Sequence, residues 1–157
     1  MREFSVPLMA RSLMPQAGHM PKRELSRPEV ALVALELLVG LSALGGSALL
    51  LADPSGAREG MPPVETYPGI PFDSYLVPGL VLLLANGLLP LVVAVGTLAG
   101  RRWARTGHLV VGAVLAAWMA VQLAMMGPVF FLQAVIACIA LAILGLGAHL
   151  RRRSAPV

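Results

Sequence analysis

Apolar residues fill four long runs of this chain, and most polar residues lie at the two ends and in the segments between the runs. The first run, 30–52, has about 23 residues, which form about 34 Å of helix at about 1.5 Å per residue. A hydrocarbon core is about 30 Å thick, so a helix of this length can cross it. The pattern therefore predicts an all-α fold, a bundle of four transmembrane helices.

Polar residues that flank the first apolar run fix its start. Ser26 and Glu29 have the spacing of a capping box, and Pro28 is tolerated in the first turn of a helix. The run is too long for a signal-peptide core and lacks a small-residue cleavage site before Asp53, so we expect an uncleaved signal anchor. The predicted helices cover about residues 27–52, 75–99, 108–126 and 129–150.

Glycine and proline mark two irregular points in the other runs. Gly87 and Pro90 predict a kink near the middle of the second helix. Gly127 and Pro128 predict a tight periplasmic hairpin, because one helix over 109–150 would be about 63 Å long, roughly twice the hydrocarbon thickness. The last two runs therefore form separate helices.

The segment 53–73 is the long loop between the first two predicted helices. Proline and glycine are so dense in it that we expect no regular structure there. Asp73 or Ser74 is expected to cap the second helix. Four acids against one arginine give the segment a net charge of −3: Asp53, Glu59, Glu65 and Asp73 against Arg58.

The two ends of the chain lie outside the predicted membrane domain, 26–153. Residues 1–25 contain three prolines and scattered basic residues without a helical period, so we expect a disordered cytoplasmic tail. An alternative places the apolar residues of this tail on the membrane surface. Residues 154–157 form a short second tail, and Met20 offers a later initiation site than Met1.

Basic residues cluster at every second end of the apolar runs. Of the twelve Lys and Arg residues, eleven lie in the stretches 1–28, 101–107 and 151–153. The cytoplasmic side of a membrane protein carries the excess of Lys and Arg, so both termini are expected in the cytoplasm and 53–73 in the periplasm. We expect a multi-pass protein of the bacterial inner (cytoplasmic) membrane.

The composition is typical of a single membrane domain and argues against nucleic-acid binding, disulfide bonding and cysteine-based zinc binding. The chain has 157 residues, of which 57% are hydrophobic and 13% charged, and its mean hydropathy is +0.79. The basic residues behind its net charge of +4 flank apolar runs and form no basic face, so we expect no nucleic-acid partner. The single cysteine, Cys138, excludes an internal disulfide and a cysteine-based zinc site.

Glu36 is an acid inside the first apolar run, and a charged side chain there must face protein rather than lipid. It lies on a helix stripe of mostly small residues, which suits close helix contact. The stripe consists of positions 29, 33, 36, 40, 43 and 47. Expected neighbours are Thr97 and, nearer the surface, His108 or His149. Two interpretations stay open: a neutral acid hydrogen-bonded between helices, or a proton relay, cation relay or ligand anchor.

Further polar and aromatic side chains outline an outward-facing pocket. Gln122 and Gln133 lie about five residues on either side of the predicted hairpin, so their amides can meet at equal depth. Asn86 lies near mid-membrane, Trp118 lies one turn below Gln122, and Tyr75 lies above them. Such a pocket suits a small apolar or amphipathic ligand held by a few amides. The alternative is that the amides only tie helices together.

The sequence contains no pattern typical of a metal site, a cofactor site or an enzyme. His19, His108 and His149 have no ligand spacing among themselves, so we expect no metal site and no cofactor. The sequence contains no glycine-rich phosphate loop, nucleophile elbow or metalloprotease motif. Glu36 alone is a poor acid–base set, so we expect no enzyme and no catalytic residue.

One set of residues carries a family resemblance: the segment 71–80, PFDSYLVPGL, followed by Trp118, Gln122, Gly127 and Gln133. Through them the chain resembles uncharacterised small four-helix bacterial integral membrane proteins, over about residues 65–145. The resemblance implies the fold and the membrane location and transfers no catalytic residue. By topology and Glu36, the chain also looks like DoxX-like proteins and sterol-isomerase-type emopamil-binding relatives, which use intramembrane acids.

The leading functional interpretation is a non-enzymatic membrane protein that serves as a small accessory or interaction subunit. Its expected partners are the lipid bilayer and either another membrane protein or a second copy of this chain. The alternative is a module that binds a small molecule or lipid, or a proton-coupled transport module, with an outer-facing pocket. A membrane enzyme that acts on a lipid or quinone is a third, weaker interpretation.

Overall fold

The computed structural model describes residues 24–67, 69–127 and 131–153. Over these ranges the chain is helical and contains no strand. The predictions made for 1–23, for 128–130 of the hairpin and for 154–157 lie outside the described residues.

The described chain forms long helices joined by short helical turns. In order they are α1 (Arg27–Ala52), η2 (Ala57–Glu59), η3 (Val64–Thr66), α2 (Leu76–Val81), η4 (Leu82–Leu88), α3 (Leu89–Leu98), α4 (Ala104–Met126) and α5 (Phe131–Arg153). Because α2, η4 and α3 follow one another without a break, they count as one helix, Leu76–Leu98. Four helices are therefore long and apolar enough to cross a membrane, which confirms the predicted all-α, four-helix fold.

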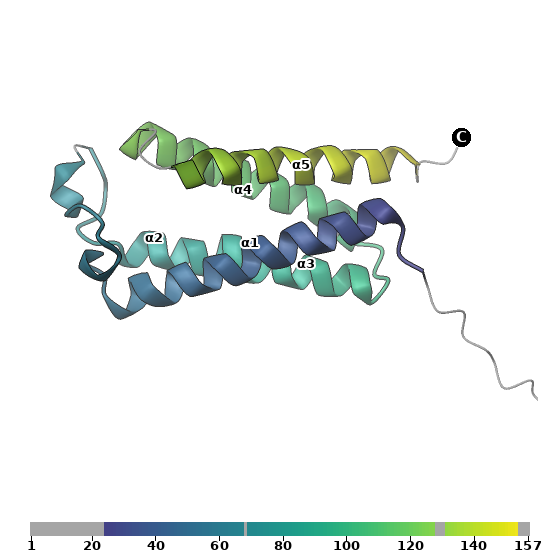
Figure 1. The fold of residues 1–157 in the computed structure, drawn as a ribbon, viewed down its shortest axis with the longest axis horizontal. Helices are drawn as coiled ribbons and strands as arrows, with labels where there is room; N and C mark the ends of the chain where they lie inside the picture. Colours follow the sequence, from purple (N-terminus) through teal and green to yellow (C-terminus); the bar gives the residue numbers. More distant parts are fainter. Residues whose placement is uncertain (1–23, 68, 128–130, 154–157) are drawn as a thin grey trace, which may run out of the picture.

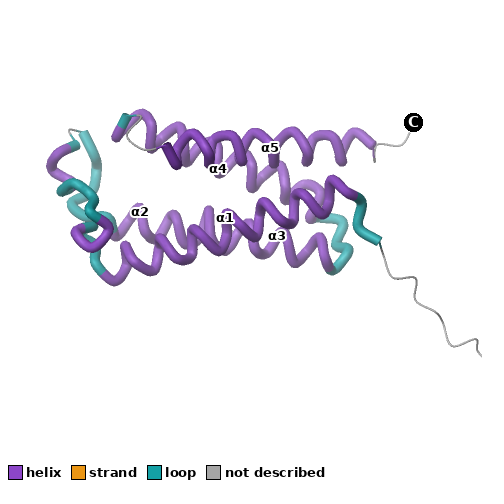
Figure 2. Tube along the Cα trace, viewed as in Figure 1, coloured by secondary structure: helices purple, strands orange, loops and turns teal. Residues whose placement is uncertain are grey.

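The long helices lie roughly antiparallel in two layers, α4 with α5 and α1 with the α2–η4–α3 helix (Figure 1). Their loops lie at the two ends of the bundle (Figure 2). The start of α1, the α3–α4 turn and the end of α5 share one end, which we call the basic end. It carries Arg27, Arg101, Arg102, Arg105, Arg151, Arg152 and Arg153. We call the opposite end, which carries the connection 53–75, the loop end.

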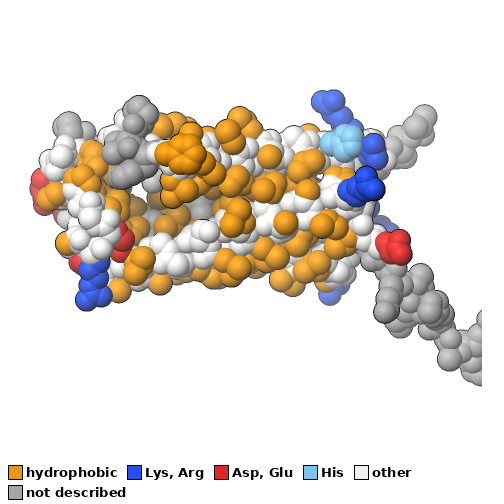
Figure 3. All heavy atoms as spheres, viewed as in Figure 1, with side chains coloured by type: hydrophobic (Ala, Val, Ile, Leu, Met, Phe, Trp, Pro, Cys, Tyr) orange, Lys and Arg blue, Asp and Glu red, His pale blue; other side chains and the backbone are white. Residues whose placement is uncertain are grey.

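Apolar side chains cover the middle of the bundle, and the charged side chains visible in Figure 3 lie near its two ends. Large apolar residues are exposed on every long helix, for example Leu41, Leu84, Val121 and Leu141. A protein surrounded by water rarely exposes a continuous apolar belt of this kind, whereas a lipid-embedded one requires it.

Helix α1 packs through the small-residue stripe that the sequence predicted. All six of its positions, 29, 33, 36, 40, 43 and 47, are buried. The closest approach is at Gly40, where an added Cβ atom would lie 2.7 Å from two side-chain carbons of Leu91 and 3.1 Å from the carbonyl oxygen of Gly87. The absence of a side chain at Gly40 therefore sets how closely α1 crosses the second membrane helix.

The irregularity expected at Gly87 and Pro90 takes the form of a π-helix, η4. Pro90 has no N–H to donate, and its ring crowds the carbonyl group one turn earlier, at residue 86. A wider π turn accommodates both effects without interrupting the membrane helix. Asn86 lies within η4, and π turns inside α-helices are frequent at functional sites.

Several predicted helix ends differ from the structure. The capping box is present, since Glu29 Oε2 accepts from the Ser26 N–H at 2.9 Å and from the Ser26 hydroxyl at 2.8 Å. Helix α2 has Tyr75 as its N-cap, rather than Asp73 or Ser74. Helix α4 begins at Ala104, four residues before the prediction, and α5 continues to Arg153.

The connection 53–75 is more ordered than predicted, because it contains the 3-10 turns η2 and η3. Its first turn is held by Asp53, whose Oδ1 accepts from the Ser55 hydroxyl at 2.6 Å and whose Oδ2 accepts from the Arg58 N–H at 3.2 Å. These hydrogen bonds, the one from Ser55 above all, lower the pKa of the Asp53 carboxyl. Local side-chain bonds thus compensate for the proline and glycine content of the segment.

Candidate functional site

A cavity of about 350 Å³ lies at the loop end of the bundle. Its walls come from the end of α1, the connection 53–75, the first turns of the second membrane helix and the last turns of α4. Among the described residues, the lining is apolar except for the Gln122 amide, the Tyr75 hydroxyl and the Trp118 indole N–H: Leu50, Met61, Ile70, Phe72, Tyr75, Val77, Pro78, Val81, Leu82, Trp118, Val121, Gln122, Met125 and Met126. The volume lies near the lower end of the range for small-molecule sites, about 300–1,000 Å³.

Tyr75 anchors the connection 53–75 over the cavity. Its hydroxyl donates to the carbonyl oxygen of Pro62 at 2.8 Å, and its N–H donates to the carbonyl oxygen of Pro54 at 2.8 Å. Gly56 has a φ of 73°, and a Cβ atom there would lie 2.8 Å from the Tyr75 ring, so the close fit requires glycine. Burial raises the pKa of the Tyr75 phenol, which therefore stays a neutral hydrogen-bond donor.

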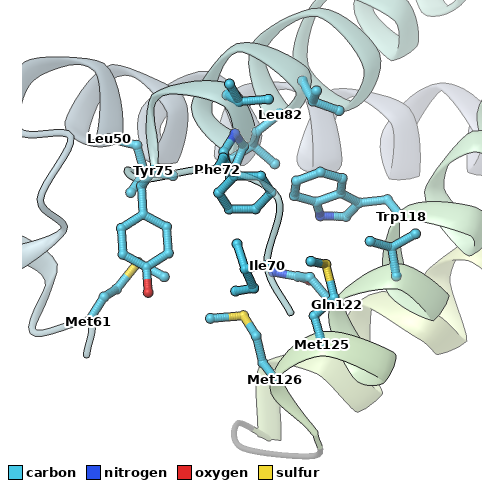
Figure 4. A pocket seen from close by; sticks show the side chains of 14 residues that line it. Leu50, Met61, Ile70, Phe72, Tyr75, Leu82, Trp118, Gln122, Met125 and Met126 are labelled. Atoms are coloured by element: carbon cyan, nitrogen blue, oxygen red, sulfur yellow. The ribbon is translucent and has the colours of Figure 1, made fainter. Parts of the chain in front are cut away.

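One face of α4 forms the opposite wall. Trp118, Gln122, Met125 and Met126 share this face because they recur at intervals of three, four and seven or eight residues. Figure 4 shows the Trp118 ring beside Phe72 of the connection and the Gln122 side chain extended toward Ile70. Methionine side chains fill irregular apolar space and adapt to different occupants, which suits a wall that receives a ligand.

The cavity opens sideways between α2 and α4. Val77 and Val81 of α2 and Val121 of α4 line it and are also exposed on the outer surface of the bundle. Helix α4 packs mainly on α5 and α3 and also contacts η4. The part of the lining that is exposed between α2 and α4 is therefore apolar.

The structure brings together three of the residues predicted to form a binding site. Tyr75, Trp118 and Gln122 line the cavity, whereas Asn86 and Gln133 are buried outside its lining. The expected meeting of Gln122 with Gln133 across the hairpin stays a prediction. Sequence reasoning missed the contributions of Met61, Ile70 and Phe72, and the available signal was the presence of large apolar residues within a charged, proline-rich segment.

Asn86 lies in η4, one helical turn deeper in the bundle than Leu82 of the cavity lining. Its side chain is 2% exposed, and neither amide atom has a hydrogen-bond partner. A buried amide without a partner costs about 1–3 kcal/mol relative to a satisfied one. The bundle therefore keeps an unsatisfied polar group directly below the cavity.

Glu36 lies in a second polar cluster, near the basic end, with His108 and Thr97. The three side chains come from α1, α4 and α3, and they are 0%, 1% and 3% exposed. Nδ1 of His108 lies 2.7 Å from Oε1 of Glu36, and Nε2 of His108 lies 3.2 Å from Oγ1 of Thr97. The expected neighbours His108 and Thr97 are thus present, while His149 is exposed. The relative membrane depth expected for His108 stays a prediction.

Glycine again permits the close packing around this cluster. A Cβ atom at Gly147 of α5 would lie 3.2 Å from the Cβ atom of His108, and one at Gly107 of α4 would lie 2.8 Å from Val93 of α3. Helices α5 and α3 therefore pack closely on α4 around His108, which is buried. Such packing excludes water and strengthens every polar interaction inside the cluster.

No group of three or more His, Cys, Asp or Glu side chains within residues 24–67, 69–127 and 131–153 is arranged to hold a metal ion. Comparison with known proteins finds no matching family model, no matching curated protein and no matching solved structure. The resemblances drawn from the sequence therefore stay predictions, and the function has to be argued from the cavity and the buried cluster.

Proposed function

We propose that this chain is an integral membrane protein that binds the apolar part of a small amphipathic ligand in the loop-end cavity. The observation that carries the proposal is the sideways opening between α2 and α4, where cavity-lining valines are also exposed on the apolar outer surface. In a bilayer this surface faces hydrocarbon, so a lipid chain can pass into the cavity without entering water. The occupant we propose is such a chain.

The orientation follows from the charges at the two ends. The basic end carries seven arginines among the described residues and is proposed to face the cytoplasm, with both termini, of a bacterial inner membrane. The loop end, with its acidic connection, then faces the periplasm. The cavity would take ligands from the outer leaflet of the bilayer.

The lining favours a neutral, hydrogen-bonding ligand over a charged one. No charged side chain lines the cavity, and the Tyr75 hydroxyl already donates to Pro62. The Gln122 amide and the Trp118 indole N–H are left as the polar groups that can orient a ligand through hydrogen bonds. We propose binding rather than catalysis, because the lining offers no acid–base pair for a reaction.

Fluorescence of Trp118 tests this proposal directly. The chain has two tryptophans, so the Trp103→Phe variant leaves Trp118 as the only reporter. In bilayers that contain lipids with brominated acyl chains, which quench tryptophan on contact, we expect strong quenching of Trp118. Val121→Phe should narrow the opening and reduce the quenching.

Val110→Phe is the matched control, because Val110 is also on α4 and is 45% exposed against 51% for Val121, but lies outside the cavity lining. Equal quenching in both variants would contradict lateral access. The accessory-subunit interpretation makes a different prediction, since it expects a stoichiometric membrane partner to co-purify and Val121→Phe to have no effect on quenching.

A further inference from the structure

The cluster of Glu36, His108 and Thr97 lies outside the cavity and has no part in the proposed ligand binding. Three helices each contribute one polar side chain to a point where the bundle is otherwise filled by Val93, Val111 and neighbouring apolar residues. Placing an acid inside a membrane helix costs about 2.5–3.5 kcal/mol at its centre and less nearer the interface. The question is which protonation state makes this arrangement stable.

The hydrogen-bond network fixes the protons on one side of the imidazole. The Thr97 hydroxyl has a single hydrogen, and the Val93 carbonyl oxygen accepts it at 3.0 Å. The Thr97 oxygen must then accept from His108, so Nε2 carries a hydrogen. One proton remains to be placed in the 2.7 Å contact between His108 Nδ1 and Glu36 Oε1.

The surroundings of the second carboxyl oxygen of Glu36 indicate where that proton lies. Glu36 Oε2 is buried and has no hydrogen-bond partner. A carboxylate would place about half of its negative charge on this unpartnered oxygen in apolar surroundings, which is costly. A neutral carboxylic acid instead leaves Oε2 as a carbonyl oxygen, while its O–H donates to Nδ1 of a neutral imidazole.

Other charged groups do not compensate for an ionised Glu36. Helix α3 faces the cluster with Thr97, and α5 faces it at Gly147. On α1 the nearest acid is Glu29, which is two turns away and caps the helix, and Arg105 of α4 is exposed. Among the described residues near the basic end, Glu29, Glu36 and His108 are the buried ionisable ones.

We propose that Glu36, His108 and Thr97 form a proton-binding site in the membrane core, in which Glu36 is a neutral acid that exchanges its proton at the basic end. The ligand of this site is a proton. His108 lies four residues from the start of α4, about 6 Å along the helix axis, whereas Glu36 lies sixteen residues from the loop-end terminus of α1, about 24 Å. The shorter route therefore leads through His108 to the basic end.

Infrared spectroscopy of the protein in lipid bilayers tests the proposal. Near neutral pH, the spectrum of the wild type minus that of Glu36→Gln should contain the C=O band of one protonated carboxyl group. This band should shift to lower frequency in D₂O, because its proton exchanges. Glu65→Gln is the control, since Glu65 is exposed in the connection and its removal should affect only carboxylate bands.

Two results would overturn the proposal. A difference spectrum with only carboxylate bands would show a permanent ion pair, and a protonated band that does not shift after prolonged exchange in D₂O would show a purely structural hydrogen bond. If Glu36→Gln does not fold, Glu36→Asp takes its place, because the protonated band must change with this substitution if it belongs to Glu36, and it must shift in D₂O. The outcome is independent of lipid binding in the cavity.

Discussion

Gly40→Ala should weaken the crossing between α1 and the second membrane helix. The new Cβ atom would lie 2.7 Å from Leu91 side-chain carbons, which can move, and 3.1 Å from the Gly87 carbonyl oxygen, which belongs to the backbone. Overpacking of this kind costs about 1–3 kcal/mol. Alanine also recovers about 0.5–1 kcal/mol of helix propensity relative to glycine, so the raw effect understates the packing cost.

Gly45→Ala is the matched control, because Gly45 is exposed on the same helix and a Cβ atom there meets no atom within 4 Å. Gly45→Ala gains the same helix propensity without the close contact. The difference in the free energy of unfolding between the two variants therefore measures the cost of overpacking at Gly40. We expect Gly40→Ala to be less stable than Gly45→Ala by about 1–3 kcal/mol. Unfolding in mixed micelles with increasing SDS, followed by circular dichroism, measures this difference. Equal stabilities would refute the close crossing.

Three other substitutions test separate contacts. Glu36→Leu should destabilise the protein by about 1–3 kcal/mol relative to Glu36→Gln, because it strands the buried His108 Nδ1, and the same SDS titration checks this. Tyr75→Phe should cost about 0.5–1.5 kcal/mol and speed amide hydrogen exchange around Pro62, whose carbonyl loses its donor. The lowered pKa of Asp53 means that its hydrogen bonds contribute stability that is fully present above the ordinary carboxyl pKa of about 3.9 and is lost as the pH falls through the lowered pKa of the folded protein. Lowering the pH should therefore speed hydrogen exchange of the 53–58 backbone amides in the wild type. This acid-induced increase should be absent in Asp53→Asn.

The fold was predictable from sequence because hydrophobic length and helix-breaking residues act locally. Four apolar runs and a capping box at Ser26 were enough to locate the helices, and the small-residue stripe of α1 correctly identified its buried face. The π turn was only partly predictable, since Pro90 indicates an irregularity but not how the backbone absorbs it.

The cavity was less predictable, because it depends on contacts between distant parts of the chain. The positions of Trp118 and Gln122 along their helix correctly predicted that they lie at the loop end of the bundle. The sequence analysis treated the connection 53–73 as unstructured, so it did not predict that Ile70 and Phe72 form a wall of the cavity. It also placed Asn86 in the same pocket, although the amide lies one turn below the lining. The direction in which a side chain points relative to the neighbouring helices depends on tertiary packing, which the sequence pattern does not contain.

The most direct measurement of the central claim is photo-cross-linking in bilayers that contain a lipid with a diazirine at the end of one acyl chain, followed by mapping of the labelled peptides. The account predicts labelling of cavity residues, above all Trp118 and Met125, and a selective loss of this labelling in Val121→Phe but not in Val110→Phe. Labelling restricted to outward-facing residues such as Leu41 and Leu141, unchanged by Val121→Phe, would contradict it.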